Sequence, residues 1–361
     1  MIMNLSSDFR EKLSKTVRTC WLSPSNIALI KYWGKKGFQL PANPSLSFSL
    51  TEAYTITKVT AEYNTDENGP EVSFIFEGER NDEFAQKIEN FLFHLQGHLE
   101  FLPYVKLYIE SGNNFPHSAG IASSASALSA LALCLECIQQ QLSDKRLPDN
   151  EIIRNASFIA RLGSGSACRS VYGGFSIWGQ HPDFVGSSDD YSVPIDFEPG
   201  KLFRNIRDSI LIVDQSPKKV SSRAGHELMK GHPFANARYE QAMVNLTRLR
   251  KSLKENDWDV FAEVVENEAL SLHAMMLSSS PGFILMHPNT LNIVEHFYEL
   301  RKQNNIRMCF TLDAGPNLHI LYPEEETEKV RNVLETLRSF CFDGKILNDM
   351  IGIGPQNKQC K

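Results

Sequence analysis

Residues 113–126 read Asn-Asn-Phe-Pro-His-Ser-Ala-Gly-Ile-Ala-Ser-Ser-Ala-Ser and lead into an Ala- and Leu-rich segment, 125–141, which is predicted to be helical. Small side chains let the main chain approach a ligand closely, and the first N–H groups of a helix have no partner within it. The helix dipole also favours negative charge at that end. The stretch therefore indicates a phosphate-binding loop, as in an enzyme that handles a nucleotide. Its small residues are Gly120, Ala122, Ser123 and Ser124.

Other readings of this loop stay open. A buried helix rich in Ala and Ser, with a serine N-cap, would give a similar pattern. No GxxxxGK[ST] motif is present, so the loop is not of the Walker type. The histidines and cysteines also lack the spacing of zinc ligands, so a structural zinc is not expected.

Length and composition indicate a globular protein of two domains. The chain has 361 residues, of which 42% are hydrophobic and 22% are charged. The net charge of −6 provides no basic field for nucleic acid, so local Lys and Arg residues must hold any anionic ligand. No run approaches the roughly 20 apolar residues of a membrane span. Residues 1–18 lack the apolar core of a secretion signal. Seven scattered cysteines, an odd number, favour reduced thiols, and a cytoplasmic location is expected.

The pattern of the chain predicts an α+β sandwich. A Pro-, Gly-, Asp- and Ser-rich loop at 179–200 suggests a boundary between domains 1–200 and 201–361. In the second half, paired helices are expected on one face of an antiparallel sheet. Strands are predicted at 17–22, 27–33, 46–50, 55–60, 72–76, 105–110, 174–178, 209–214, 307–312 and 319–322. Helices are predicted at 82–95, 125–141, 150–162, 234–255, 258–277, 290–303 and 324–340.

Residues 25–35, Ser-Asn-Ile-Ala-Leu-Ile-Lys-Tyr-Trp-Gly-Lys, form the first of four further motifs. They place Lys31, Tyr32 and Lys35 where a predicted strand runs into a glycine turn, a frequent position for site residues. Two surface lysines flanking a pair of core aromatic residues would explain the pattern equally well.

Residues 163–170, Gly-Ser-Gly-Ser-Ala-Cys-Arg-Ser, form a second anion-receptive turn. Ser164 and Ser166 supply hydroxyl groups, and Arg169 supplies a permanently charged fork for a carboxylate or phosphate. The alternative is a helix C-cap followed by a tight turn with a solvated arginine. The density of small residues around one arginine favours a site.

Two motifs lie in the second half. Residues 218–223, Lys-Lys-Val-Ser-Ser-Arg, combine three cations with two hydroxyls and suit a diphosphate, although a solvated run of charges is as compatible. In Thr-Leu-Asp-Ala-Gly-Pro-Asn, residues 311–317, Asp313 ends a hydrophobic strand beside a turn. It could be an oriented general base, or an Asx-turn residue that caps the loop.

Together these segments resemble the GHMP kinase superfamily, whose phosphate loop has the form Pro-x3-Gly-Leu-x-Ser-Ser-Ala. Here it reads Pro116-x3-Gly120-Ile121-x-Ser123-Ser124-Ala125. Three of the four further motifs, at 26–35, 163–170 and 313–317, read as signatures of the mevalonate diphosphate decarboxylase family in the order of that family. Together with the motif at 218–223, the resemblance spans residues 25 to 317. It implies a ribosomal-protein-S5-like N-terminal domain and a ferredoxin-like C-terminal domain, whose last ~15 residues could pack back on the first.

The resemblance implies an activity and a set of residue roles. The reaction would be ATP-dependent decarboxylation of mevalonate 5-diphosphate, with Mg²⁺ held through the ATP phosphates and serine hydroxyls rather than by a protein cage. The implied catalytic residues are Asp313, Lys31 and Arg169. The implied substrate contacts are Asn26, Tyr32, Lys35, Ser164, Ser166 and Arg223. The implied ATP contacts are Pro116, Gly120, Ala122, Ser123, Ser124 and Ser222.

The resemblance further implies a homodimer. A mevalonate 3-kinase and a phosphomevalonate decarboxylase remain alternatives within the superfamily. A ligand-binding sensor without turnover is a third, but a sensor would not need Asp313, Lys31 and Arg169 together.

Overall fold

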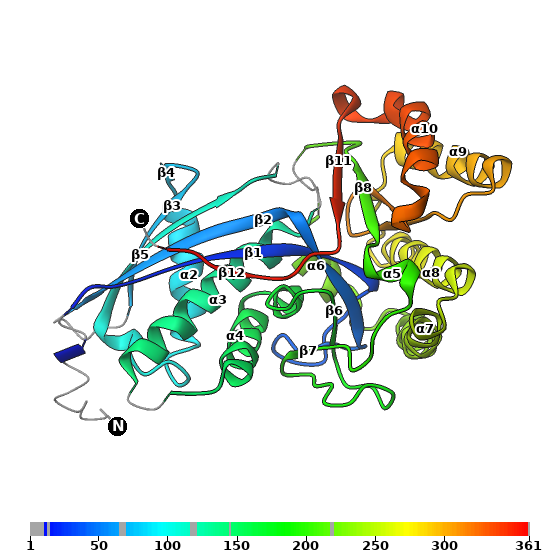
Figure 1. Cartoon of the computed structure of the whole chain (residues 1–361). Coiled ribbons are helices and arrows are strands. Elements are labelled where there is room, and N and C mark those ends of the chain that lie inside the picture. Colours follow the sequence, from blue (N-terminus) through cyan, green and yellow to red (C-terminus); the bar gives the residue numbers. More distant parts are fainter. Residues whose placement is uncertain are drawn as a thin grey trace.

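A computed structural model describes residues 11–12, 15–64, 70–115, 121–143, 146–216 and 220–359, with the main chain alone at 222 and 223. Pro116, Gly120 and Lys218 lie outside the described residues. Two sheets organise the described chain (Figure 1).

The first sheet has eight strands in the described chain. Its strands are β1 (Val17–Ile30), β2 (Ser45–Tyr63), β3 (Glu71–Phe76), β4 (Glu79–Arg80), β5 (Val105–Asn113), β6 (Phe175–Trp178), β7 (Ser192–Pro194) and β12 (Gln356–Asn357). The order is β12–β1–β2–β5–β3–β4, and β6 joins β2 and β7. All pairs are antiparallel except β3 with β5. Although β12 is nearly last in the chain, it lies beside β1 (Figure 1).

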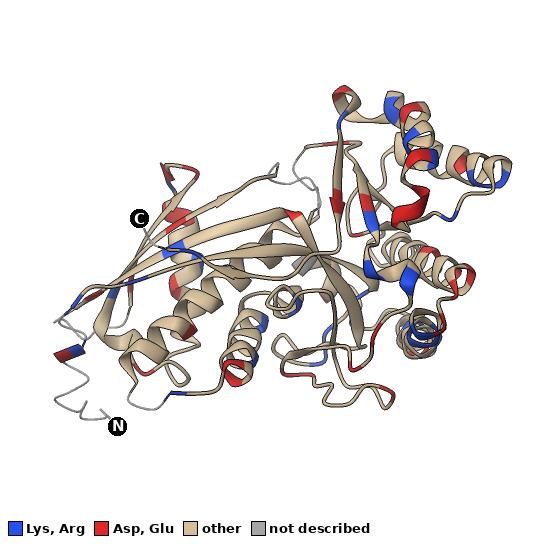
Figure 2. Cartoon of the chain, in the orientation of Figure 1, with Lys and Arg blue, Asp and Glu red and all other residues tan. Residues whose placement is uncertain are grey.

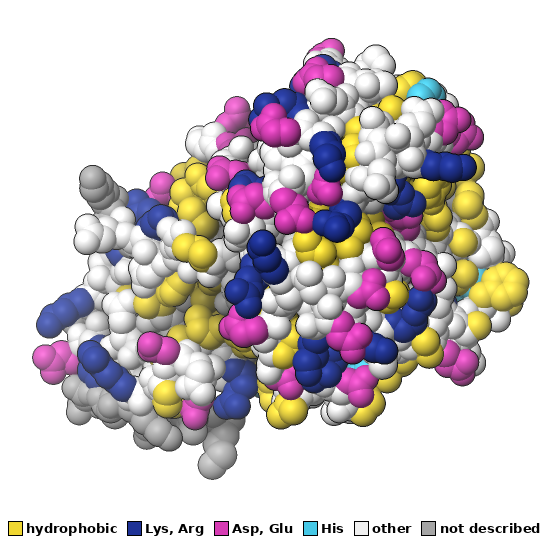
Figure 3. Space-filling model, turned by 45° about the vertical axis from the view of Figure 1, so that its right-hand side comes forward, with side chains coloured by type: hydrophobic (Ala, Val, Ile, Leu, Met, Phe, Trp, Pro, Cys, Tyr) yellow, Lys and Arg dark blue, Asp and Glu magenta, His cyan; other side chains and the backbone are white. Residues whose placement is uncertain are grey.

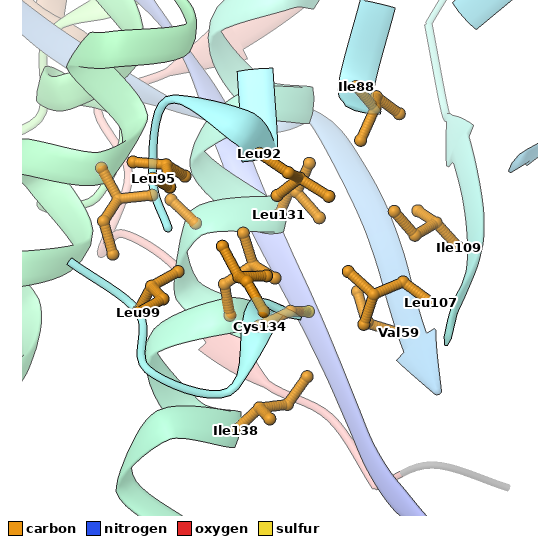
Figure 4. Close-up of a cluster of buried hydrophobic side chains, with 14 of the residues drawn as sticks. Val59, Ile88, Leu92, Leu95, Leu99, Leu107, Ile109, Leu131, Cys134 and Ile138 are labelled. Carbon is orange, nitrogen blue, oxygen red and sulfur yellow. The ribbon is translucent and has the colours of Figure 1, made fainter. Parts of the chain in front are cut away.

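In the part of the chain that the structure describes, three helices pack on one face of this sheet. They are α2 (Asp82–Phe93), α3 (Ser123–Leu142) and α4 (Asp149–Gly163). Figure 4 shows how side chains of α2 and α3 meet those of β2 and β5 in one buried cluster. Glu136 is the only charged residue of α3, whereas the outer helices of the second half carry many charges (Figure 2). Apolar burial therefore fixes α3, and with it the start of this helix, against the sheet.

The second sheet has four antiparallel strands in the order β11–β8–β10–β9. They are β8 (Arg207–Leu211), β9 (Cys309–Leu312), β10 (Leu318–Tyr322) and β11 (Ile346–Met350). The helices around it are α5 (Lys201–Arg204), α6 (Ser222–Glu227), α7 (Ala235–Glu255), α8 (Trp258–Leu277), α9 (Pro288–Asn304) and α10 (Thr327–Leu337).

The expectation of helices on one face of this sheet is wrong, because alternate residues of its strands enter two different cores. Ile210 and Leu321 share a buried cluster with Leu246 of α7 and Phe261 of α8. Their neighbours in the strands share another cluster with residues of α9 and α10. Helices therefore lie on both faces.

Several predicted boundaries also change. The runs 17–22 and 27–33 are one strand, β1, and 46–50 and 55–60 are one strand, β2. The predicted loop 179–200 contains β7. The predicted helix 324–340 is α10 flanked by two short 3₁₀ turns. The strands β11 and β12 lie outside all predicted strands.

Candidate active site

A carboxylate and an ammonium group from the two sheets meet where β1 and β9 end. Lys31 directly follows β1, and Asp313 directly follows β9. Lys31 Nζ donates hydrogen bonds to Asp313 Oδ1 over 2.9 Å and to the Ala28 carbonyl over 2.7 Å. The Lys31 side chain is 2% exposed and that of Asp313 is 28% exposed. The pair therefore presents its carboxylate, and not its ammonium, to a ligand.

The charge of Lys31 depends on its surroundings. Burial lowers the pKa of Lys31, and the positive charge of Arg169 adds to this effect. The negative charges of Asp313 and Glu268 oppose it. An adjacent ammonium favours the ionised form of a carboxylate, and that form is the one that accepts a proton. The arrangement suits general-base chemistry at Asp313.

Arg169 forms the second part of the site, at the end of the 3₁₀ turn Gly165–Arg169. Its buried guanidinium donates to Ser47 Oγ over 2.9 Å, to Ser45 Oγ over 2.5 Å and to Asn26 Oδ1 over 3.3 Å. Within the described chain these bonds use three of its five N–H groups. The charge of Asp313 acts on Arg169 and opposes the lowering of its pKa by burial. The remaining donors can bind a carboxylate.

The glycine-rich turn that carries Arg169 fits closely against its neighbours. A Cβ at Gly165 would lie 2.5 Å from the Trp178 ring and 3.0 Å from the Tyr32 ring. Ser164 and Ser166 flank this glycine and are half-buried. The side-chain amide of Asn26 bonds Arg169, Ser170 and the carbonyl of Ser166, which places it beside the Arg169 guanidinium.

Tyr32, Trp33 and His226 form an aromatic stack beside this turn. The His226 ring centroid lies 4.3 Å from that of Tyr32 and 4.6 Å from that of Trp33. Burial, together with the charge of Lys35, lowers the pKa of His226 to about 3. The neutral ring accepts the Gly34 N–H at Nδ1 over 2.9 Å. This contact places α6, which begins at Ser222 and Arg223, next to the Lys31–Lys35 segment.

The start of α3 supplies a different set of donors. Ala122 precedes the helix with a φ of 42°, and the first N–H groups bonded within the helix are those of Ala125 and Ser126. The N–H groups of Ser123 and Ser124 therefore point out of the helix start, where the dipole favours an anion. Ser124 is exposed and Ser123 is half-buried. This geometry fits a phosphate.

Two parts of the predicted site are not described by the structure. Pro116 and Gly120 lie outside the described residues, as does Lys218. Ser222 and Arg223 are described by their main chain at the start of α6, without their side chains. In the described part of the chain, no group of three or more His, Cys, Asp and Glu residues could hold a metal ion.

Sequence reasoning missed four buried residues of α7 and α8. Glu268 accepts the Lys31 main-chain N–H over 2.8 Å, and His273 donates to the Asp313 carbonyl over 3.1 Å. Arg238 and Asn245 hold Glu268. Their position in the sequence could have indicated them, because Glu268 and His273 lie on the apolar stripe of α8 that includes Val264 and Leu272. Charged residues are almost never fully buried without a partner.

Both halves of the chain match models of one known protein family. Residues 23–191 match the model described as diphosphomevalonate decarboxylase-like N-terminal domain. Residues 209–355 match the mevalonate 5-diphosphate decarboxylase C-terminal domain. The diphosphomevalonate decarboxylase of Candida albicans is 31% identical over 327 residues, 86% of this chain and 86% of that protein. That of Ganoderma lucidum is 30% identical over 352 residues, 92% of this chain and 84% of that protein.

Solved structures agree with these matches. The mevalonate diphosphate decarboxylase from Staphylococcus aureus has a TM-score of 0.81 at 30% identity, covering 96% of this chain and 100% of that chain. A structure described as MDDEF in complex with MVAPP, AMPPCP and magnesium also has a TM-score of 0.81, at 27% identity and the same coverage.

No helix in the described chain is both long and apolar enough to cross a membrane.

Proposed function

The chain belongs to the diphosphomevalonate decarboxylase family, and from that premise we propose that Asp313, Lys31 and Arg169 form its catalytic centre. It is an ATP-dependent decarboxylase of the mevalonate pathway. It converts mevalonate 5-diphosphate to isopentenyl diphosphate, with release of carbon dioxide, ADP and phosphate. The 2.9 Å contact of Lys31 with a partly exposed Asp313 is the observation that carries the proposed centre.

Asp313 is the proposed general base. The 3-hydroxyl of the substrate is a poor leaving group, so it is phosphorylated before it departs. Asp313 accepts the proton of this hydroxyl as its oxygen attacks the ATP γ-phosphate, and ADP leaves. Lys31 keeps a positive charge beside the carboxylate while this happens.

Arg169 is the proposed carboxylate anchor. Its free N–H groups bind the substrate carboxylate and fix the direction of the C–C bond to the carboxylate carbon, which is the bond that breaks. The electrons of that bond form the new double bond and expel the 3-phosphate, while the carboxylate leaves as carbon dioxide. Ser45, Ser47 and Asn26 hold the guanidinium in place and act through it.

Tyr32, Lys35 and Arg223 are the proposed contacts of the substrate diphosphate, with Ser164 and Ser166 lining the same side. The Tyr32 hydroxyl supports this, because it is buried and has no hydrogen-bond partner among the described residues. A diphosphate oxygen would supply the acceptor that a buried hydroxyl needs. Lys35 and Arg223 are both cations, and two cations suit a diphosphate better than a neutral group.

ATP is proposed to bind at the start of α3. Ala122, Ser123 and Ser124 offer main-chain and hydroxyl donors there, and Pro116, Gly120 and Ser222 are proposed to complete the contact. A related structure holds AMPPCP and magnesium. Serine hydroxyls and ATP phosphates would hold Mg²⁺, which would neutralise charge on the transferred phosphoryl group.

The test is to incubate the protein with ATP, Mg²⁺ and mevalonate 5-diphosphate and to measure ADP and carbon dioxide together. We expect equal amounts of both. ADP without carbon dioxide would instead indicate a mevalonate 3-kinase. Faster turnover of mevalonate 5-phosphate than of the diphosphate would indicate a phosphomevalonate decarboxylase, and neither product would indicate a sensor.

A homodimer and a cytoplasmic location are also proposed. The dimer rests on the family resemblance, and sedimentation velocity should give twice the chain mass of 40.8 kDa, whereas a persistent monomer would contradict it. The six cysteines of the described chain are free thiols, which supports a reducing compartment. Basic and acidic side chains are interspersed on the face drawn in Figure 3, and no nucleic-acid partner is proposed.

A further inference from the structure

Glu268 of α8 is a fully buried carboxylate that contacts the main chain of Lys31. Its Oε2 accepts the Lys31 N–H over 2.8 Å, and the residue is 0% exposed. Arg238 donates to both of its oxygens, over 3.1 and 2.5 Å, and Asn245 donates to Oε1 over 2.8 Å. These contacts compensate the charge of Glu268 and fix its carboxylate against α7.

His273 makes the corresponding contact with the other member of the pair. It is 2% exposed, and its Nε2 donates to the Asp313 carbonyl over 3.1 Å. It follows Glu268 by five residues, a rise of about 7.5 Å along α8. One helix therefore contacts the main chain of two residues that come from different sheets.

The distance between Lys31 Nζ and Asp313 Oδ1 depends on where these two main chains lie. Lys31 is held on its other side as well, because Asn43 Nδ2 donates to the Lys31 carbonyl over 2.9 Å. Catalytic groups must be placed within about half an ångström to act together. Rigid helices and strands give such precision better than loops do.

We propose that Glu268 is a positioning residue for the Lys31–Asp313 pair, with His273 as its counterpart on the same helix. The proposal rests on the catalytic roles proposed above for Lys31 and Asp313. Glu268 positions Lys31 by accepting the main-chain N–H of Lys31. It also adds a negative charge close to the buried ammonium.

That charge gives a readout that a merely structural residue would not change. The charged groups that act on Lys31 are Asp313 directly after β9, Glu268 from α8 and Arg169 from the 3₁₀ turn. Glu268 opposes the lowering of the Lys31 pKa by burial. When this charge is removed, Lys31 should lose its proton at a lower pH.

Glu266 provides a matched control on the same helix. It is 7% exposed and pairs with Arg301 of α9 through bonds of 2.5 and 3.3 Å. Glu266→Gln therefore weakens a buried Glu–Arg pair of the same kind, but one that does not contact Lys31 or Asp313. Any general effect of such a loss on folding appears in this variant too.

The experiment compares Glu268→Gln with Glu266→Gln in kcat, KM and urea stability across alkaline pH. We expect Glu268→Gln to lower kcat by about 10- to 100-fold, because a small misplacement of reacting groups has an effect of this size. We also expect the alkaline limb of the plot of kcat against pH to move to lower pH. Glu268→Asp keeps the negative charge on a side chain that is shorter by one methylene group. It should lower kcat without moving the alkaline limb of the pH profile. Glu266→Gln should leave both unchanged.

The proposal is overturned if Glu268→Gln folds and shows the same kcat and alkaline limb as Glu266→Gln. If Glu268→Gln does not fold, the double variant with Glu268→Gln and Arg238→Gln takes its place, because it leaves no unpaired buried charge. It is compared with Glu266→Gln in the same way and with the same expected and contradicting results. The wild-type protein separates the two levels of failure. If it releases no carbon dioxide, the proposed function fails, whereas an active wild type with an unmoved Glu268→Gln profile refutes only the positioning role.

Discussion

Among single residues, Arg169 shows how the site combines burial with an unused binding capacity. It is 2% exposed, yet its described partners are two serines and an asparagine rather than a carboxylate. A buried cation without an anionic partner is costly. A substrate carboxylate would therefore gain from binding there, because it supplies the missing charge.

Replacing Arg169 by Lys should lower kcat/KM by about 10- to 100-fold, since a lysine cannot reproduce the planar fork that contacts Ser47, Ser45 and a carboxylate together. Steady-state kinetics with mevalonate 5-diphosphate measure the loss. Arg154→Lys, an exposed position on α4, is the control and should be unchanged. Equal kcat/KM in the two variants would show that Arg169 does not bind the carboxylate.

At the scale of elements, α6 is attached to the site through a neutral histidine. His226 stacks on Tyr32 and Trp33 and accepts the Gly34 N–H. Gly225 before it lets α6 pack closely, because a Cβ there would lie 2.5 Å from the Trp33 ring. Protonation of His226 would remove the acceptor and place a charge in this stack.

The pKa of His226 is about 3 in the folded protein, compared with 6.5 as the ordinary value. Between these values the unfolded chain binds more protons, so this group's contribution to the free energy of unfolding is present above pH 6.5 and is lost as the pH falls toward 3. His226→Gln should be less stable than wild type by about 1 kcal/mol at pH 7. Urea unfolding at pH 7 and pH 4.5 should show this difference in the free energy of unfolding close and then reverse, because protonation of His226 in the unfolded chain destabilises only the wild type. A constant difference would contradict the assignment.

The elements that sequence reasoning missed depend on contacts between distant residues. Most helices and short strands followed from periodicity alone. Two separate strands were predicted at 17–22 and 27–33, yet β1 continues through Pro24. A register shift between Pro24 and Asn26 interrupts the pairing with β2 there, and proline is found in strands at such irregularities. Likewise β2 stays extended across residues 51–53, whose N–H groups bond Asp349, almost 300 residues away.

The same reason limits prediction of the site. The motifs predicted Lys31, Arg169 and Asp313, and only the family resemblance implied that Lys31 lies beside Asp313, where the structure has it. Glu268 belongs to no motif, because its role depends on the packing of α8 against two strands.

In the whole molecule, the site lies at the junction of the two sheets, and a second contact holds that junction. Asp349 of β11 accepts the N–H groups of Thr51 and Glu52 at Oδ1 and that of Ala53 at Oδ2. Next to it, the Gly352 N–H bonds the Ser49 carbonyl over 2.7 Å. The last part of the chain thus ties the second sheet to β2 of the first.

Asp349→Asn should destabilise the protein by about 1–3 kcal/mol, because its amide NH₂ would face the Ala53 N–H and leave buried donors unsatisfied. Urea unfolding measures this loss. Asp343→Asn is the control, since Asp343 is exposed with a φ of 48°, which asparagine adopts readily. Equal midpoints for the two variants would show that Asp349 does not hold the sheets together.

We propose that Asp313, held by Lys31 across the junction, is the base of an ATP-dependent decarboxylation. The most direct test is the rate at which ADP and carbon dioxide appear with wild type and with Asp313→Asn, whose amide keeps the shape but cannot accept the proton. We expect equal amounts of both products from wild type. In the variant we expect the rate of both to fall by about 10²- to 10⁴-fold, with the fold intact by circular dichroism. If a folded Asp313→Asn protein forms both products at a rate close to wild type, Asp313 is not the base.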